Sequence, residues 1–462
     1  MRPFEIIYII LVGWGAIQIF YKARKRSNTR LLYKVTFSVF LIHIFIEQYR
    51  WQMVPAYVLG ALLLVIYKKN IPSTGKFFIM ILVVLSFSLP SLIPVISMPT
   101  PTGKHKIGTS IHHWVDQERE EWFTDDPNDF RQIMIQLWYP AKLGEKNKRA
   151  PYLDRIDLRA ETMAKAGGFP KFLIQHLELT KTNSYLNLFI DNNATPMPIV
   201  IISHGITGTR HIHTALAERL ASHGYLVVGV DHSYDANLTI FPDGSSANYR
   251  SEITGHADSV RIREKQIKTR AADISFIIDQ LYDIQIGKIK HLANGYLDLN
   301  SIGVAGHSYG GGTSTLAAYM DGRIKSVLIL DAWLNPLPKN IIYNGIDQPI
   351  LYMGRPNWDD SDYPSNNTLV DTLMNNTRGP NYHITIKGTR HLNYCDAPLF
   401  SPLVKHILDD IKGSGGQIPN FHDSAFSALK EYLWPGNVRE LRNLVERAAT
   451  VSYTHLRAHE TL

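Results

Sequence analysis

The amino-acid sequence predicts an α/β fold, a mostly parallel sheet with helices on both faces, preceded by an all-α transmembrane segment of about four helices. Three observations support this prediction. Residues 1–98 consist largely of apolar segments. Downstream of them, short apolar strands alternate with amphipathic helices, as in a parallel sheet that is covered on both faces. Finally, Ser308 stands between two glycines, where one such strand passes into a segment of small residues.

Composition limits the classes of function that the chain can have. Of its 462 residues 45% are hydrophobic, and the formal net charge is only +7. The basic residues do not alternate with aromatic residues as they do in nucleic-acid-binding segments, so no nucleic-acid partner is expected. The single cysteine, Cys395, excludes an intramolecular disulfide and a cysteine-based metal site. We expect neither a metal nor a cofactor.

Residues 1–98 contain four apolar segments: Phe4–Tyr21, Leu31–Ile46, Met53–Tyr67 and Phe77–Met98. The first and the last are long enough to span a bilayer. The middle two are shorter and contain Lys34 and Pro55, so the sequence is compatible with three spans or with four. A cleavable signal peptide is disfavoured, because the first segment lacks a basic start and a small-residue cleavage site.

Basic residues predict the orientation of these segments. Nine follow the first or the third segment, and the loop between the second and the third holds Arg50 alone. The nine are Lys22, Arg24, Lys25, Arg26, Arg30, Lys34, Lys68, Lys69 and Lys76. Basic loops remain in the cytoplasm, so four spans would place the chain from residue 99 onward outside it. We therefore expect a multi-pass protein of the cell membrane with an extracytoplasmic soluble domain.

That domain is expected to cover residues 99–412, and its elements follow in order. The predicted strands are Ile107–Val115, Gln132–Tyr139, Ile199–Ser203, Leu226–Asp231, a run from Ser301, Ser326–Leu330, Pro349–Met353 and Tyr382–Ile386. The predicted helices are His213–Ser222, residues 262–281 and Thr313–Met320. The acidic stretch Asp116–Asp129 is expected to be a solvated turn. Residues Pro151–Ala194 fit no sheet unit and are expected to cap the site.

The stretch Gly306-His307-Ser308-Tyr309-Gly310 matches the G-x-S-x-G nucleophile elbow between a strand and a helix. A nucleophilic serine must occupy a strained backbone position there, and Gly306 and Gly310 allow neighbouring backbone to pass close to it. The following helix directs its N-terminal N–H groups toward an oxyanion beside the serine. A single motif of this kind also occurs in purely structural turns. The residues at the other strand ends are therefore needed to decide whether this motif is catalytic.

Ligands bind at the carboxyl ends of parallel strands, and candidate catalytic groups follow several of the predicted strands there. His204-Gly205-Ile206 follows one strand, and the N–H of Ile206 would pair with that of Tyr309 as an oxyanion hole. Asp331 and His391 follow later strands, which gives the chain order Ser, Asp, His of α/β-hydrolases. His391 would take the proton of Ser308 while a carboxylate orients its ring. Spacing leaves Asp331 and the loop pair Asp359/Asp360 as alternatives for that carboxylate.

Several of these motifs together resemble the plasma-type platelet-activating factor acetylhydrolases and their bacterial relatives. The motifs are Gly306-His307-Ser308-Tyr309-Gly310, Leu330-Asp331-Ala332-Trp333, Ser203-His204-Gly205, Gly388-Thr389-Arg390-His391, Leu137-Trp138-Tyr139-Pro140, Lys181-Thr182-Asn183-Ser184-Tyr185 and Ala221-Ser222-His223-Gly224. The resemblance covers roughly residues 103–400. It implies an α/β-hydrolase fold and a calcium-independent serine esterase with Ser308, Asp331 and His391 as triad. It also implies phospholipid substrates with short or oxidised acyl chains.

The C-terminal residues resemble other proteins. Trp434-Pro435-Gly436-Asn437-Val438-Arg439-Glu440-Leu441 is similar to the lid of AAA+ enhancer-binding transcription activators, although the chain has no G-x-x-x-x-G-K-[ST] phosphate loop. Residues 451–462 resemble a translated sequencing adaptor. We interpret residues 413–450 as a foreign lid-like fragment and 451–462 as an artefact, with a hydrolase that has lost its final helix.

The sequence thus predicts a membrane-anchored serine carboxylic ester hydrolase that acts on a lipid or small ester. Another acyl hydrolase or a peptidase remains an alternative, because one triad serves many acyl transfers. A transcriptional regulator is a second alternative, suggested by the tail alone. A non-catalytic binding module on a hydrolase fold is a third, disfavoured by the intact Ser308, Asp331 and His391.

Overall fold

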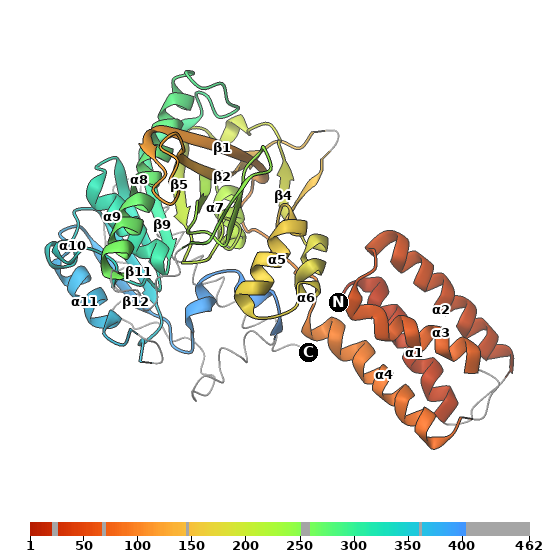
Figure 1. Ribbon diagram of the computed structural model, residues 1–462. Helices are drawn as coiled ribbons and strands as arrows, with labels where there is room; N and C mark the ends of the chain where they lie inside the picture. Colours follow the sequence, from red (N-terminus) through yellow and green to blue (C-terminus); the bar gives the residue numbers. More distant parts are fainter. Residues whose placement is uncertain (21–25, 67–70, 145–146, 251–258, 360–362, 403–462) are drawn as a thin grey trace. The chain divides into compact units, whose positions relative to one another are not determined.

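The computed structural model describes residues 1–20, 26–66, 71–144, 147–250, 259–359 and 363–402 (Figure 1). These residues form two compact units. The first contains residues 1–97, 155–180 and 398–402, and the second contains residues 98–154 and 181–397. The predicted foreign fragment, the predicted adaptor sequence and the expected loss of the final helix concern residues that lie outside the described part.

The first unit is helical. Its elements are α1 (Pro3–Phe20), α2 (Arg26–Glu47), α3 (Val54–Ile66), α4 (Ser73–Leu92), α5 (Ile156–Gly167) and α6 (Phe172–Gln175). Among the described helices, α1 and α4 are long and apolar enough to cross a membrane, and the apolar stretch Trp51–Ile66 is shorter. Their inner faces pack Val12, Leu59 and Ile79 into one core.

Arg50, the basic residue between α2 and α3, is not a free charge. Its Nε and Nη2 atoms contact the two carboxylate oxygens of Glu5 at 2.6 and 2.9 Å. Its Nη1 atom donates to the carbonyl of Ile93 at 2.6 Å, and Arg2 also pairs with Glu5 at 2.8 Å. Because a carboxylate neutralises it, Arg50 does not offset the basic residues that follow α1 and α3.

The second unit is built on a ten-stranded sheet in the order β12-β11-β10-β9-β5-β6-β2-β1-β4-β3. Its strands are β1 (Lys106–Glu120), β2 (Phe130–Ala141), β3 (Arg149–Pro151), β4 (Lys181–Leu186), β5 (Met197–Ser203), β6 (Leu226–His232), β9 (Leu297–His307), β10 (Ile324–Leu330), β11 (Ile350–Gly354) and β12 (Asn381–Thr385). The strands from β12 to β6 run parallel to one another. The strand order reverses between β9 and β5, where α/β sheets open a crevice for ligands.

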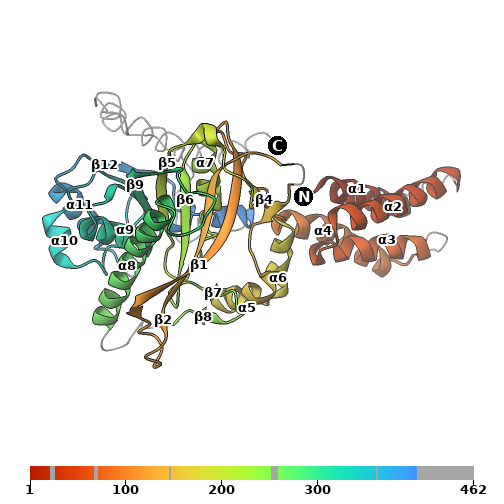
Figure 2. The same cartoon turned by 90° about the horizontal axis from the view of Figure 1, so that it is seen from above.

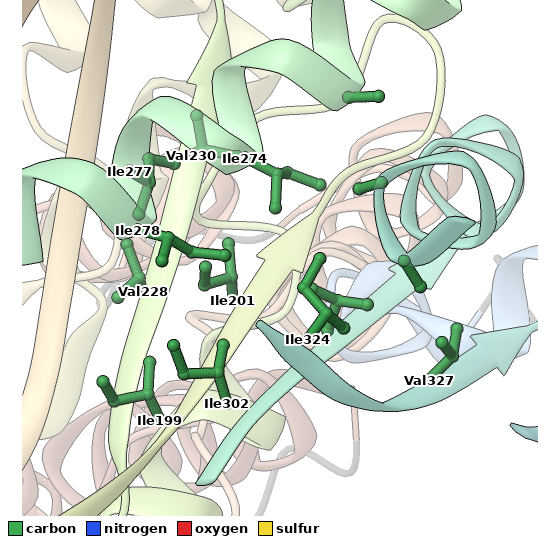
Figure 3. Close-up of a cluster of buried hydrophobic side chains, with 14 of the residues drawn as sticks. Ile199, Ile201, Val228, Val230, Ile274, Ile277, Ile278, Ile302, Ile324 and Val327 are labelled. Carbon is green, nitrogen blue, oxygen red and sulfur yellow. The ribbon is translucent and has the colours of Figure 1, made fainter. Parts of the chain in front are cut away.

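Helices cover both faces of this sheet (Figures 1 and 2). They are α7 (Thr214–Ser222), α8 (Ser259–Gln285), α9 (Tyr309–Met320), α10 (Lys339–Asn344) and α11 (Asn366–Asn376). Alternate residues of each strand serve the two faces: Ile199 and Ile201 of β5 pack against α8, whereas Val200 and Ile202 share a cluster with residues of α7. Figure 3 shows Ile201 and Val228 of the sheet beside Ile274 and Ile278 of α8. The predicted parallel sheet, covered on both faces, is confirmed.

Three local features differ from the sequence-based prediction. Strand β1 continues to Glu120, and Asp116 and Glu121 are buried in ion pairs with Arg119 and Arg131, so the solvated turn expected over Asp116–Asp129 is wrong at these two acids. Helix α9 begins at Tyr309, immediately after Ser308, and not at Thr313. Strand β4 lies within the stretch that was assigned to no sheet unit, and it pairs with β1.

Candidate active site

Ser308 is held in a strained turn between β9 and α9. Its backbone has φ 57°, a conformation that side-chain-bearing residues rarely adopt, and the side chain is 6% exposed. A Cβ atom on Gly306 would lie 2.0 Å from the carbonyl oxygen of Gly310, and one on Gly310 would lie 2.1 Å from that of Ser203. Both glycines are therefore required by close backbone approach, as the motif predicts.

The loop after β5 lies against this turn, since a Cβ atom on Gly205 would be 3.2 Å from the Cβ atom of Ser308. The carbonyl of Gly205 accepts hydrogen bonds from the Nδ1 atom of His204 at 2.6 Å and from the N–H of Gly208 at 3.1 Å. In a trans peptide the carbonyl and the following N–H point in opposite directions. These bonds therefore fix the direction in which the N–H of Ile206 points.

Arg270 of α8 supports the same loop through hydrogen bonds. Its Nη2 atom donates to the carbonyl of His204 and, at 3.1 Å, to the hydroxyl of Ser203. Its guanidinium carbon lies 4.7 Å from the ring centroid of Tyr309, the first residue of α9. Burial and then the charge of Arg270 hold the pKa of His204 well below its ordinary value, so His204 is neutral. It can then donate from Nδ1 and accept the N–H of His232 at Nε2.

The structure brings Asp331 and His391 together at the carboxyl ends of β10 and β12. The Nδ1 atom of His391 lies 2.6 Å from Oδ2 of Asp331, which is fully buried, whereas the His391 side chain is 28% exposed. The N–H of Asp331 donates to the carbonyl of Met353 at 2.7 Å, which holds the aspartate at φ 43°. Within the described residues, the carboxylate bonded to His391 is thus that of Asp331. The alternative Asp360 lies outside them.

His307 connects the loop that contains His391 with the turn at Ser308. Its Nε2 atom donates to the carbonyl of His391 at 2.9 Å, and the two ring centroids are 4.6 Å apart. Burial and the neighbouring charges of His391 and His213 hold the pKa of His307 well below its ordinary value. Burial also lowers the pKa of His213 to about 4. His391 therefore lies beside the residue that precedes Ser308, among neutral imidazoles.

A serine, a histidine and an aspartate also form a fully buried series of hydrogen bonds that starts at the end of β5, just before the loop that contains Ile206. We call this series the buried line, and sequence reasoning missed it. The hydroxyl of Ser203 lies 2.9 Å from Nε2 of His232, whose Nδ1 atom lies 2.9 Å from Oδ2 of Asp273. Arg131 binds both oxygens of Asp273, at 3.0 and 2.7 Å. Arg131 and Asp273 stand at positions where β2 and α8 are otherwise largely apolar, and this pattern is the signal that could have found the network.

The described residues contain no group of three His, Cys, Asp or Glu side chains that could hold a metal. A strained serine, a carboxylate-bound histidine and two oriented backbone segments suit acyl transfer through a covalent intermediate.

Comparison with known proteins decides the family. The sequence model of the family described as "Platelet-activating factor acetylhydrolase, isoform II" matches residues 93–417. The chain belongs to this family. The platelet-activating factor acetylhydrolase of Canis lupus familiaris is 28% identical over 235 residues, which are 47% of this chain and 52% of that protein. The chain thus spans about half the length of this curated relative.

A solved structure agrees with the fold of this acetylhydrolase-family chain. The ferulic acid esterase from Streptomyces cinnamoneus superposes with a TM-score of 0.55 at 24% identity, covering 79% of this chain and 91% of the esterase. At this identity the likeness establishes the fold, an α/β-hydrolase fold, and not the substrate.

The C-terminal residues match a different family. The AAA+ ATPase lid domain matches residues 400–461. The DNA-binding transcriptional regulator NtrC of Azospirillum brasilense is 45% identical over 56 residues, which are 12% of this chain and 11% of the regulator. The resemblance that the sequence indicates for the tail is therefore confirmed.

Proposed function

We propose that the chain is a serine carboxylic ester hydrolase in which Ser308 is the nucleophile, His391 the general base and Asp331 the residue that orients His391. The observation that carries this proposal is the 2.6 Å contact between His391 and Asp331, together with a serine at φ 57° whose N–H donates to the carbonyl of Leu330, the residue before Asp331, at 3.0 Å. The order Ser, Asp, His along the chain and the family membership support it.

The geometry suggests how each group acts. His391 takes the proton of the Ser308 hydroxyl as its oxygen attacks the ester carbonyl carbon, and the imidazolium that forms is stabilised by Asp331. The negative charge on the substrate oxygen is stabilised by the N–H groups of Ile206 and Tyr309. Tyr309 is the first residue of α9, so its N–H has no acceptor within the helix. His391 then protonates the departing alcohol, and water releases the acyl group by the reverse steps.

For the substrate we propose phospholipids with short or oxidised acyl chains at the sn-2 position, which makes the chain an enzyme of lipid degradation. This rests on the names of the curated relatives, such as the dog platelet-activating factor acetylhydrolase. Another acyl hydrolase on the same fold is the alternative, and turnover of esters of increasing acyl length distinguishes the two.

We further propose that residues 1–98 anchor the enzyme in the cell membrane through about four helices, with the catalytic domain outside the cytoplasm. The apolar helices α1 and α4 support spanning, and the nine basic residues that follow α1 and α3 support the orientation. A topology reporter fused after Met98 should be active only in its extracytoplasmic form. A cytoplasmic signal would contradict the proposed orientation.

Residues 413–450 we propose to be a foreign fragment joined to the hydrolase, followed by adaptor-derived residues 451–462. The support for the foreign fragment is that the acetylhydrolase family model ends at residue 417, while the match to the AAA+ lid covers residues 400–461. The proposal for residues 451–462 rests on their sequence alone. The sequence contains no phosphate loop that would accompany such a lid. Lack of ATP binding by the full chain is expected, and measurable ATP binding would favour the regulator alternative.

The esterase proposal is tested with Ser308→Ala in the full chain, purified in detergent and assayed on short-chain esters. Turnover should fall by at least about 10³-fold, as for other serine triads. The matched control is Ser314→Ala, which removes a buried hydroxyl from the same helix region. The control should turn over esters at close to the wild-type rate. Retained activity in Ser308→Ala would show that Ser308 is not the nucleophile.

A further inference from the structure

Arg355, the residue that directly follows β11, binds the carboxylate that holds His391. Its backbone N–H donates to Oδ1 of Asp331 at 3.1 Å, and its Nε atom lies 3.2 Å from Oδ2. Oδ2 is the same oxygen that the Nδ1 atom of His391 contacts at 2.6 Å. One carboxylate oxygen is therefore shared between the imidazole and a guanidinium, and the other is held by backbone. The plane of the carboxylate is fixed from both ends.

Trp358 contacts both the guanidinium of Arg355 and the imidazole of His391. The guanidinium carbon of Arg355 lies 4.2 Å from the ring centroid of Trp358, in cation–π geometry. The Trp358 ring in turn meets the His391 ring edge to face, with centroids 5.1 Å apart at 68°. Asp331, His391, Trp358 and Arg355 thus form a closed ring of contacts, in which Arg355 and Trp358 are both buried.

We propose that Arg355 is a positioning residue for ester hydrolysis, which orients the Asp331 carboxylate and, through Trp358, holds the ring of His391 in place. The inference rests on the proposed function of Ser308, Asp331 and His391. A fully buried carboxylate loses its hydration, and a guanidinium, which is always protonated in proteins, offsets that loss with a permanent charge, while the backbone N–H of Arg355 adds a hydrogen bond.

The other groups that face this pair support the assignment of the positive charge to Arg355. Burial, followed by the charge of Asp331, raises the pKa of Tyr352 and of Tyr394 above the ordinary value, so both are neutral. His307, on the elbow side of His391, is neutral because its pKa lies well below the ordinary value. Of these described neighbours, Arg355 is the group that brings a fixed cation to Asp331.

A purely structural arginine and a positioning arginine differ in their kinetics. A structural role would affect the amount of folded enzyme and leave the rate of each folded molecule unchanged. A positioning role acts on proton transfer at His391, so it lowers kcat and leaves the binding of the ester almost unaffected. It also requires a positive charge at this place, which a lysine or an added guanidinium ion can supply in part.

The experiment compares Arg355→Met, Arg355→Lys and Arg355→Ala in the full chain in detergent, with Arg378→Met as matched control. Arg378 pairs with Asp347 on the surface, so its loss should leave the kinetics unchanged. We expect Arg355→Met to lose about 10²-fold in kcat with KM within about twofold, a part of the roughly 10⁴-fold that a misoriented triad histidine costs. Arg355→Lys should keep at least about ten times the kcat of Arg355→Met. Millimolar guanidinium chloride should raise the kcat of Arg355→Ala and not that of the wild type.

Wild-type kcat in Arg355→Met, or equal losses in the lysine and methionine variants without guanidinium rescue, would overturn the inference. Melting temperatures identify a variant that does not fold. If the methionine or alanine variant does not fold, the lysine variant decides: a folded lysine variant that is as inactive as Asp331→Asn overturns the role of the charge, and one within about tenfold of wild type supports it. Ser308→Ala is assayed in parallel. If it stays active, the proposed function and this inference both fail, whereas an inactive Ser308→Ala beside an active Arg355→Met removes only the role of Arg355.

Discussion

The described residues of the second unit contain two lines of serine, histidine and aspartate, and we propose that only one of them reacts. In the buried line, Ser203, His232 and Asp273 are joined by two contacts of 2.9 Å, and all three side chains are inaccessible to solvent. In the other, Asp331 contacts His391, whose carbonyl accepts from His307, the residue before the strained Ser308. The buried line has the more complete hydrogen bonds, so hydrogen bonding alone does not identify a nucleophile.

What surrounds each serine accounts for the difference. The hydroxyl of Ser203 donates to His232 and accepts from Arg270, so its proton and one of its two lone pairs are already engaged. Ser308 sits at the start of α9 next to the loop of Ile206, where backbone N–H groups can stabilise an oxyanion. The buried line acts instead as a support, because Ser203 and Arg270 hold the base of that loop.

The electrostatics of the buried line agree with a supporting role. Burial alone would raise the pKa of Asp273, but the charge of Arg131 and the hydrogen bonds from Arg131 and His232 outweigh it, and the pKa lies well below its ordinary value. Burial, followed by the charge of Arg270, lowers the pKa of His232 to about 4. At neutral pH the line is a fixed anion joined to a neutral imidazole.

The largest effect is expected at the two aspartates. Asp331→Asn should lower kcat/KM by about 10⁴-fold, because the amide favours the wrong tautomer of His391. Asp273→Asn should instead lower the free energy of unfolding by about 3–5 kcal/mol, since it removes one of the two buried carboxylates that Arg131 binds and the one that His232 binds. Steady-state kinetics and denaturant unfolding of both variants separate the two roles. Equal kinetic losses in both variants would show that the buried line takes part in catalysis.

An intermediate effect is expected at His204, which holds the carbonyl of Gly205. His204→Leu removes the donor and should lower kcat by about 10²-fold, the loss typical of a disturbed oxyanion hole. His204→Asn keeps an N–H donor at a similar distance from the backbone and should cost less than about tenfold. Kinetics of the two variants on one ester test the role of the donor. Equal rates in the asparagine and leucine variants would contradict it.

The smallest effect, at most about tenfold in the unfolding equilibrium per pH unit, concerns Asp396, a buried carboxylate that accepts from the hydroxyl of Tyr152 and the N–H of Ala215. Burial raises its pKa to about 8, so the folded protein holds a proton that the unfolded chain releases above its ordinary value of 3.8. The stability from this group is therefore present at low pH and is lost as the pH rises toward 8, by at most about 1.4 kcal/mol per pH unit. Asp396→Asn should flatten this fall in unfolding midpoints measured from pH 5 to 8. Parallel profiles of wild type and variant would contradict the raised pKa.

Much of the site could be predicted because its residues directly follow apolar strands. Ser308 and Asp331 directly follow β9 and β10, and His391 lies in the loop after β12. The close backbone approach at Gly306 and Gly310 agrees with the spacing of the motif. The parallel order of the sheet followed from the alternation of strands and helices. These features depend on local pattern, which a single sequence contains.

The supporting residues could not be predicted, because they depend on contacts between distant parts of the chain. Arg131 of β2 meets Asp273 of α8 across 142 positions, and Arg270 meets His204 across 66. Arg355 meets Asp331 only because β10 and β11 are neighbours in the sheet. The acidic stretch that begins in β1 was misassigned because its acids pair with nearby arginines: Asp116 with Arg119, and Glu121 with Arg131 of the neighbouring strand β2.

The most direct test of the contrast between the two serines is labelling of the full chain with a fluorophosphonate, followed by peptide mass spectrometry. The reagent needs an accessible serine that is activated by a neighbouring base. A single adduct on the peptide that contains Ser308 is predicted, and it should be absent in Ser308→Ala and present in Ser203→Ala. An adduct on Ser203, or labelling that persists in Ser308→Ala, would contradict the assignment of the nucleophile.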